Sequence, residues 1–123
     1  MAVGIIVASG AFAAIALAGD VATFDTKVGI ANRAPAFHGK LRSDENACVA
    51  DRRVKLLRRI RPGRPAKVLG RDKTRNNGRW AITEPDEFTL KSGLYFARAK
   101  RRIIETPLPT ICDRGRSKKI FVD

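Results

Sequence analysis

The sequence contains only one histidine, His38, among its 123 residues. A catalytic zinc site needs several converging ligands, commonly two histidines and a carboxylate, so His38 alone cannot supply one. A serine nucleophile needs a histidine base, and His38 is the single candidate. No glycine-rich phosphate loop is present, because Gly63, Gly70 and Gly78 stand singly in expected turns. We therefore expect no enzyme activity, no catalytic or cofactor-binding residue, no metal site and no small-molecule substrate.

Acidic residues are also scarce, with 12 Asp+Glu against 25 Lys+Arg and a formal net charge of +13. Such an excess attracts polyanions, for which nucleic acid, anionic lipid headgroups and phosphate-bearing wall polymers are candidates. The basic residues are spread along the chain instead of forming a tail, so composition and solubility also explain the charge. The one acidic cluster, Glu84, Asp86 and Glu87, lacks the further carboxylates of a calcium site, and we interpret it as a solvated turn.

Charge is absent from residues 1–18. This apolar stretch is shorter than the ~20 residues of a membrane-spanning helix, and it ends in Ala16-Leu17-Ala18, small residues of the kind that signal peptidase accepts. We interpret it as a secretory signal peptide removed after Ala18, although no Lys or Arg precedes its apolar core. A buried N-terminal helix is the alternative, but glycine and serine interrupt the stretch and it has no polar face. Residues 19–35 would then be a linker or edge strand, and residues 36–123 the domain.

The two cysteines are Cys48 and Cys112. In an exported protein such a pair predicts one disulfide, whereas in a cytosolic protein it predicts two free thiols. The interpretations of the cysteines and of the N-terminal segment are therefore linked. Both cysteines lie in expected loops, so we expect the bridge to clip one end of the domain and not to cross its core.

Alternation of apolar and polar residues with period two recurs through the domain and predicts short, half-buried strands. A helix over residues 52–60 is an alternative, disfavoured by the immediate stop at Pro62-Gly63. The expected strands cover residues 37–43, 52–60, 66–74, 79–83, 88–90, 94–104 and 117–122. We therefore expect an all-β fold after the signal helix: an antiparallel β-sandwich of about seven strands, immunoglobulin- or transthyretin-like.

Two turn motifs support this fold. Asn77-Gly78 is typical of a hairpin with a type I′ turn, because both residues tolerate positive φ. Gly93-Leu94-Tyr95 is typical of a tyrosine corner, in which the tyrosine hydroxyl bonds to the backbone just upstream. With Trp80 facing inward after the first turn, we expect these residues to determine the fold and not the function.

Four segments follow one another along the chain as parts of a single wider pattern. They are Phe37-His38-Gly39-Lys40-Leu41, Val54-Lys55-Leu56, residues 74–80 with Thr74, Gly78 and Trp80, and Gly93-Leu94-Tyr95. Together they resemble the carboxypeptidase regulatory-like domain family, a transthyretin-like (prealbumin-like) sandwich appended to many exported proteins. The resemblance covers about residues 37–122. It implies a non-catalytic stalk, spacer or surface-interaction domain. The high basic charge and the cysteine pair depart from the family's pattern.

Basic residues on two expected strands supply the functional hypothesis. On each strand they project from one face, and if the strands pair they form a ladder able to track phosphates. These residues are Arg53, Lys55 and Arg59 on one strand and Arg98, Lys100 and Arg102 on the other.

The partner expected from this ladder is an anionic polymer of the cell wall or membrane surface, or another protein. Base recognition needs exposed aromatic side chains. Trp80 and Tyr95 are expected to be buried, which leaves only Phe96. Nucleic acid is therefore the less favoured partner. A basic cytosolic protein that binds nucleic acid is the alternative if residues 1–18 are not a signal peptide.

Overall fold

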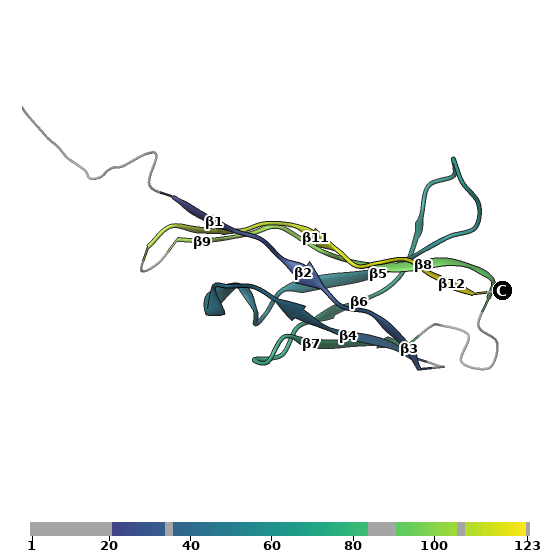
Figure 1. Cartoon of the computed structure of the whole chain (residues 1–123), viewed down its shortest axis with the longest axis horizontal. Coiled ribbons are helices and arrows are strands. Elements are labelled where there is room, and N and C mark those ends of the chain that lie inside the picture. The colour runs from purple at the N-terminus through teal and green to yellow at the C-terminus, as the bar shows by residue number, and fades with distance from the viewer. Residues whose placement is uncertain (1–20, 34–35, 84–90, 106–107, 123) are drawn as a thin grey trace, which may run out of the picture.

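The computed structural model describes residues 21–33, 36–83, 91–105 and 108–122, and it shows an all-β protein (Figure 1). The expected signal peptide, the strand at residues 88–90 and the acidic cluster fall outside these ranges. Within them one turn of 3₁₀ helix, η3 (Asn46–Cys48), accompanies the strands, and no α-helix occurs. The strands are β1 (Ala22–Phe24), β2 (Lys27–Val28), β3 (Ala31–Arg33), β4 (Ala36–Arg42), β5 (Arg53–Arg59), β6 (Lys67–Lys73), β7 (Arg79–Thr83), β8 (Gly93–Ala99), β9 (Arg102–Ile104), β10 (Thr110–Cys112), β11 (Gly115–Arg116) and β12 (Ile120–Val122).

Two antiparallel sheets form the body of the protein. The first has the order β11-β8-β5-β6, with β12 also paired to β8. In the second, β4 pairs with β2, β3 and β7. Figure 1 shows the two sheets as layers, with β5 and β8 in one and β4 and β7 in the other. A third, small sheet of β1, β10 and β9 extends beyond them, and its β1–β10 pair is parallel.

The apolar core lies between the two main sheets. The rings of Phe37 on β4 and Tyr95 on β8 stack across it, with centroids 4.7 Å apart. Its buried members come from both layers and from residues 28–30: Val28, Ile30, Phe37, Leu41, Val54, Leu56, Trp80, Ile82, Tyr95, Ala97 and Ala99. The inward positions expected for Trp80 and Tyr95 are thus confirmed.

The tyrosine corner is also present. The Tyr95 hydroxyl donates a hydrogen bond to the Lys91 carbonyl at 2.5 Å. Gly93 begins β8 with φ of 141°, a backbone conformation that side chains with a Cβ rarely adopt. Tyr95 therefore fixes the entry of β8 into the sheet.

The expected Asn77-Gly78 hairpin differs from the structure in two respects. Gly78 has φ of 85°, but Asn77 is not among the residues with positive φ, so the turn is not type I′. The Gly78 N–H donates to the Arg75 carbonyl at 2.8 Å, as in a three-residue loop whose final glycine takes the left-handed conformation. The flanking strands also separate, since β6 joins one main sheet and β7 the other.

Other expected strands are divided differently. The strand expected over residues 94–104 is two strands, because the chain leaves β5 after Lys100 and β9 pairs with β10 instead. The closing strand expected over residues 117–122 is shorter, β12 alone. Residues 21–33, expected as a linker or edge strand, contain β1, β2 and β3.

The disulfide joins Cys48 and Cys112, whose Cα atoms are 5.4 Å apart. It ties η3 to β10 at the end of the body where the small sheet begins. Cys48 lies in the expected loop, but Cys112 is the last residue of β10 and not a loop residue.

Beside the disulfide, the guanidinium of Arg52 is completely buried. Its nitrogens donate four hydrogen bonds: to Thr26 Oγ1 at 3.0 Å and to the carbonyls of Cys48, Lys100 and Asp113 at 2.9, 2.9 and 2.8 Å. Burial lowers the pKa of Arg52, and the nearby cation of Arg102 adds to the effect, while Asp113 opposes it. One side chain thus links the nearby η3 to three segments that are distant in the sequence.

Although β6 and β7 belong to different sheets, Asp72 on β6 connects them through its side chain. Its carboxylate accepts the Ala81 N–H at 2.9 Å and the Arg75 guanidinium at 3.0 Å. Partial burial raises the pKa of Asp72, but these hydrogen bonds lower it by more, so the net pKa lies below its ordinary value.

We expect Asp72→Asn to lower the free energy of unfolding by about 1 kcal/mol at neutral pH, because a charge-assisted contact is lost. A depressed carboxyl pKa stabilises the folded state above the unfolded pKa of about 4, and this contribution disappears as the pH falls through the folded pKa. Urea unfolding between about pH 2.5 and pH 7 measures the difference. The gap between wild type and variant should close below about pH 4; a gap constant over the whole range would contradict the assignment.

Candidate polyanion-binding face

The two strands that carry the expected basic ladder are neighbours in the first main sheet. Lys55 on β5 lies directly opposite Arg98 on β8. The Lys100 N–H donates to the Arg53 carbonyl at 2.9 Å, which places these residues opposite each other as well. Because side chains alternate along a strand, these four lie on the face turned away from the core, whereas Val54, opposite Ala99, is buried.

The other two residues of the expected ladder make different contacts. The Arg59 guanidinium lies over the Phe96 ring, 5.8 Å from its centroid. Arg102 belongs to β9, and its Nη1 donates to the Ala50 carbonyl at 3.1 Å. Arg102 still lines a hollow together with Arg53 and Lys100. Arg59, which lies over Phe96, lines none of the hollows that contain the other residues of the ladder.

Register adds three cations that the sequence did not assign to this surface. Arg71 and Lys73 on β6 lie opposite Lys55 and Arg53, and Arg116 on β11 lies opposite Arg98. Four cations thus follow one another across four strands; we call Arg71, Lys55, Arg98 and Arg116 the cation row. With Lys73, Arg53 and Lys100 beside it, the cation row forms the cationic face.

Little negative charge balances this face. Among the strand residues of its sheet the only acid is Asp72, which lies opposite Val54 and so belongs to the other side. Within the part of the chain that the structure describes, the single ion pair is Arg75–Asp72, and it includes none of the seven cations. The seven cations are therefore not held in ion pairs among the described residues, and positive charge exceeds negative charge on the cationic face.

Three hollows of about 510, 370 and 290 Å³ lie along the cationic face, and Lys100 lines all three. Lys55 separates two of them, the first bordered by Arg71 and the second by Arg98. Asp51 and Asp72 contribute the carboxylates at their margins. The surface is concave between its cations.

The aromatic side chain nearest the cation row is covered. Phe96 is only 2% exposed, and the guanidinium groups of Arg59 and Arg116 lie 5.8 and 5.5 Å from its ring centroid. Cation–π contact of this kind fixes the two arginines over an apolar patch. Phe121, opposite Leu94 on the far part of the sheet, is exposed.

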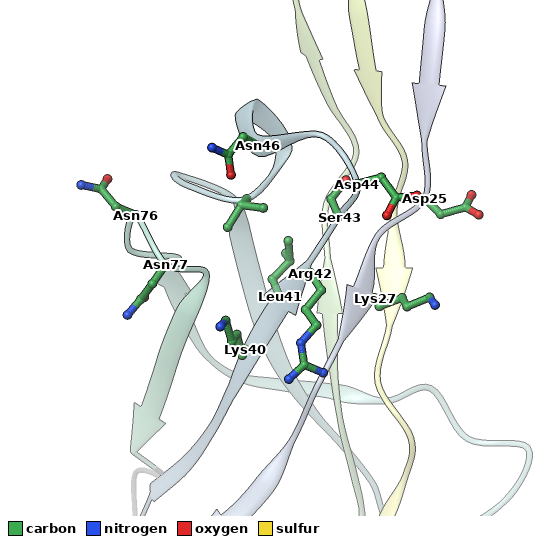
Figure 2. Close-up of a pocket in the computed structure, with 11 residues that line it drawn as sticks. Asp25, Lys27, Lys40, Leu41, Arg42, Ser43, Asp44, Asn46, Asn76 and Asn77 are labelled. Carbon is green, nitrogen blue, oxygen red and sulfur yellow. The ribbon is translucent and has the colours of Figure 1, made fainter.

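A larger cavity of about 620 Å³ lies elsewhere, between β2, the end of β4, η3 and the turn before β7 (Figure 2). Figure 2 shows Asn76 and Asn77 on one side and Asp25 and Lys27 on the other, with these side chains directed apart. No histidine or aromatic residue lines it. The arrangement has neither a nucleophile paired with a base nor a converging set of metal ligands.

Metal ligands and membrane spans give no alternative site within the described ranges. There, no three His, Cys, Asp or Glu residues are grouped closely enough to hold a metal ion. No helix in that part of the chain is long and apolar enough to cross a membrane. The cationic face is therefore the candidate functional site of the described residues.

Comparison of the chain with known proteins identifies no partner for this face. No protein-family model matches the chain. No curated protein matches it either. The functional argument therefore depends on the chain's own residues.

Proposed function

We propose that this chain is an exported, non-catalytic β-sandwich module that binds anionic polymers at the cell surface or outside the cell. One observation carries the proposal: the pairing of β5 with β8 gathers Arg53, Lys55, Arg98 and Lys100 on one outward face. None of these four takes part in an ion pair among the described residues. Such a surface attracts polyanions and holds their phosphates by charge-assisted hydrogen bonds.

Export is supported by the disulfide, because disulfides persist in oxidising compartments outside the cytosol. The apolar residues 1–18, interpreted as a signal peptide, are consistent with this compartment. Free thiols at Cys48 and Cys112 in protein recovered from its host would contradict export.

The domain type that we propose is a transthyretin- or immunoglobulin-like sandwich of the carboxypeptidase regulatory-like kind. The tyrosine corner at Tyr95 and the core between two antiparallel sheets support it. In such a module the fold supplies a rigid support, and the function belongs to the residues on its surface.

Binding measured across a salt series tests the proposed function. The purified protein is added to isolated cell-wall polymer, to phosphatidylglycerol vesicles and to single-stranded DNA. With four phosphate contacts to a flexible chain, affinity should fall roughly 50-fold between about 50 and 200 mM salt. Retention that is independent of salt, or no retention on any of the three, would overturn the proposal. Preference for DNA would favour the cytosolic alternative.

A further inference from the structure

The geometry of the cation row is more specific than its charge. Neighbouring strands of a sheet lie about 4.8 Å apart, so four residues in register on four strands span about 14 Å. Arg71, Lys55, Arg98 and Arg116 occupy these positions, one on each strand. The row crosses the strands of the twisted sheet from β6 to β11 and places one positive charge on each strand.

The cation row places like charges directly opposite one another three times in succession: Arg71 with Lys55, Lys55 with Arg98, and Arg98 with Arg116. Like charges in directly opposed cross-strand positions destabilise a sheet. No described carboxylate pairs with any of the four, since the only ion pair lies at Asp72. The unbound sheet therefore carries an electrostatic cost that a bound anion would relieve.

The shape of the surface narrows the class of anion. The hollows on either side of Lys55 are concave and lined mainly by cations, with Asp72 as the one acidic residue. A narrow, flexible chain can enter them with successive phosphates, whereas a flat bilayer meets only the tips of the side chains. Stacking of nucleobases needs exposed rings. The Phe96 ring beside the row is covered by Arg59 and Arg116, and the exposed Phe121 is paired with Leu94, about 13 Å along β8 from Arg98.

We propose that the cation row binds a linear chain of phosphate groups without bases, lying across the strands, and that the bound phosphates relieve the repulsion within the row. This inference rests on the proposed function and adds the ligand class, its orientation and the residues that contact it. A phosphodiester polymer of the cell wall and inorganic polyphosphate share this chemistry.

The test compares two double variants that each remove two positive charges. Lys55→Gln/Arg98→Gln removes the centre of the cation row. Arg61→Gln/Arg64→Gln changes exposed residues of the loop that projects between β5 and β6 (Figure 1). Short-chain inorganic polyphosphate, isolated wall phosphodiester polymer, oligothymidylate and phosphatidylglycerol vesicles are the probes. Binding is measured by titration calorimetry, and thermal midpoints are recorded with and without polyphosphate.

The expected result has two parts with opposite signs. Lys55→Gln/Arg98→Gln should weaken polyphosphate binding about 100-fold, roughly tenfold for each lost charge-assisted contact. It should also make the slope of log affinity against log salt shallower by about 1.4. Without ligand, the same variant should melt at a higher temperature than wild type, because all three repulsive pairs of the row are gone. Arg61→Gln/Arg64→Gln should leave affinity within about threefold of wild type.

The arms distinguish the ways in which the proposal could be wrong. Equal weakening by both double variants would show that net charge binds the polymer, which overturns the cation row but leaves the proposed function. Tighter binding of vesicles or of oligothymidylate than of polyphosphate would overturn the ligand class. If orthophosphate at the same phosphate concentration raises the midpoint as much as polyphosphate does, a linear chain is not required. No salt-dependent binding of any probe would remove the proposed function as well. Preference between wall polymer and polyphosphate identifies the source of the phosphate chain.

Discussion

Arg52→Leu is expected to lower the free energy of unfolding by about 3–5 kcal/mol. The guanidinium is fully buried and satisfies a hydroxyl and three backbone carbonyls. Leucine fills much of the space but donates nothing, so four acceptors lose the hydrogen bonds from Arg52, and each such loss in a buried or part-buried site is unfavourable. Urea unfolding followed by tryptophan fluorescence measures the change, since Trp80 is in the core.

Arg53→Leu is the matched control for Arg52→Leu. Arg53 is the next residue, carries the same side chain and is exposed on the cationic face. Its replacement should change stability by less than about 0.5 kcal/mol, as is usual for surface positions. Arg52→Lys should be intermediate, because an ammonium lacks the planar fork that reaches several carbonyls at once. Equal losses for Arg52→Leu and Arg53→Leu would show that the buried hydrogen bonds are not the cause.

Removal of the disulfide is the second large effect. The bridge joins residues 64 positions apart. Closing a loop of that length contributes about 4 kcal/mol in the chain-entropy model, so Cys48→Ala/Cys112→Ala should lower the melting midpoint by about 15–30 °C. Reduction of the wild-type protein with dithiothreitol should reproduce the loss. A reductant that leaves the midpoint unchanged would mean that the bridge does not form in the purified protein.

The two effects should not add. Arg52 donates to the carbonyl of Cys48, so the bridge helps to hold one of its acceptors in place. Arg52→Leu made in the Cys48→Ala/Cys112→Ala background should therefore cost measurably less than in wild type, which a double-mutant cycle quantifies. Strict additivity would show that the disulfide and the arginine act independently.

Local chemistry made part of this fold predictable. Tyr95 two residues after Gly93 predicted a hydroxyl bonded back to the chain, and the bond to Lys91 confirms it. Period-two alternation along the strand predicted that Trp80 faces the core, because successive side chains point to opposite faces of a sheet. The turn at Gly78 was expected, but its type was wrong, because φ at Asn77 depends on how the strands leave the turn. They leave for different sheets, a tertiary outcome that the dipeptide does not encode.

The cationic face was predictable only in part. Alternation identified Arg53, Lys55, Arg98 and Lys100 as outward residues. Arg71 and Arg116 also alternate outward, but their place in the cation row depends on the pairing of β6 and β11, which no local signal specifies. No local signal in the sequence distinguishes Arg52 from Arg53. The burial of Arg52 depends on the Cys48 carbonyl meeting three further acceptors from distant segments at one point.

The parallel pairing of β1 with β10 determines how this protein would bear tension. β1 lies at one end of the body and β12 toward the other (Figure 1). From β10, which is paired with β1, the chain runs through β11 to β12. A pull between Val21 and Val122 loads the β1–β10 hydrogen bonds along the strands, so they must shear together instead of opening one by one. Beyond them, the Cys48–Cys112 bridge withholds roughly 220 Å of extended chain from stretching. A spacer built this way would stay short under load until its disulfide is reduced.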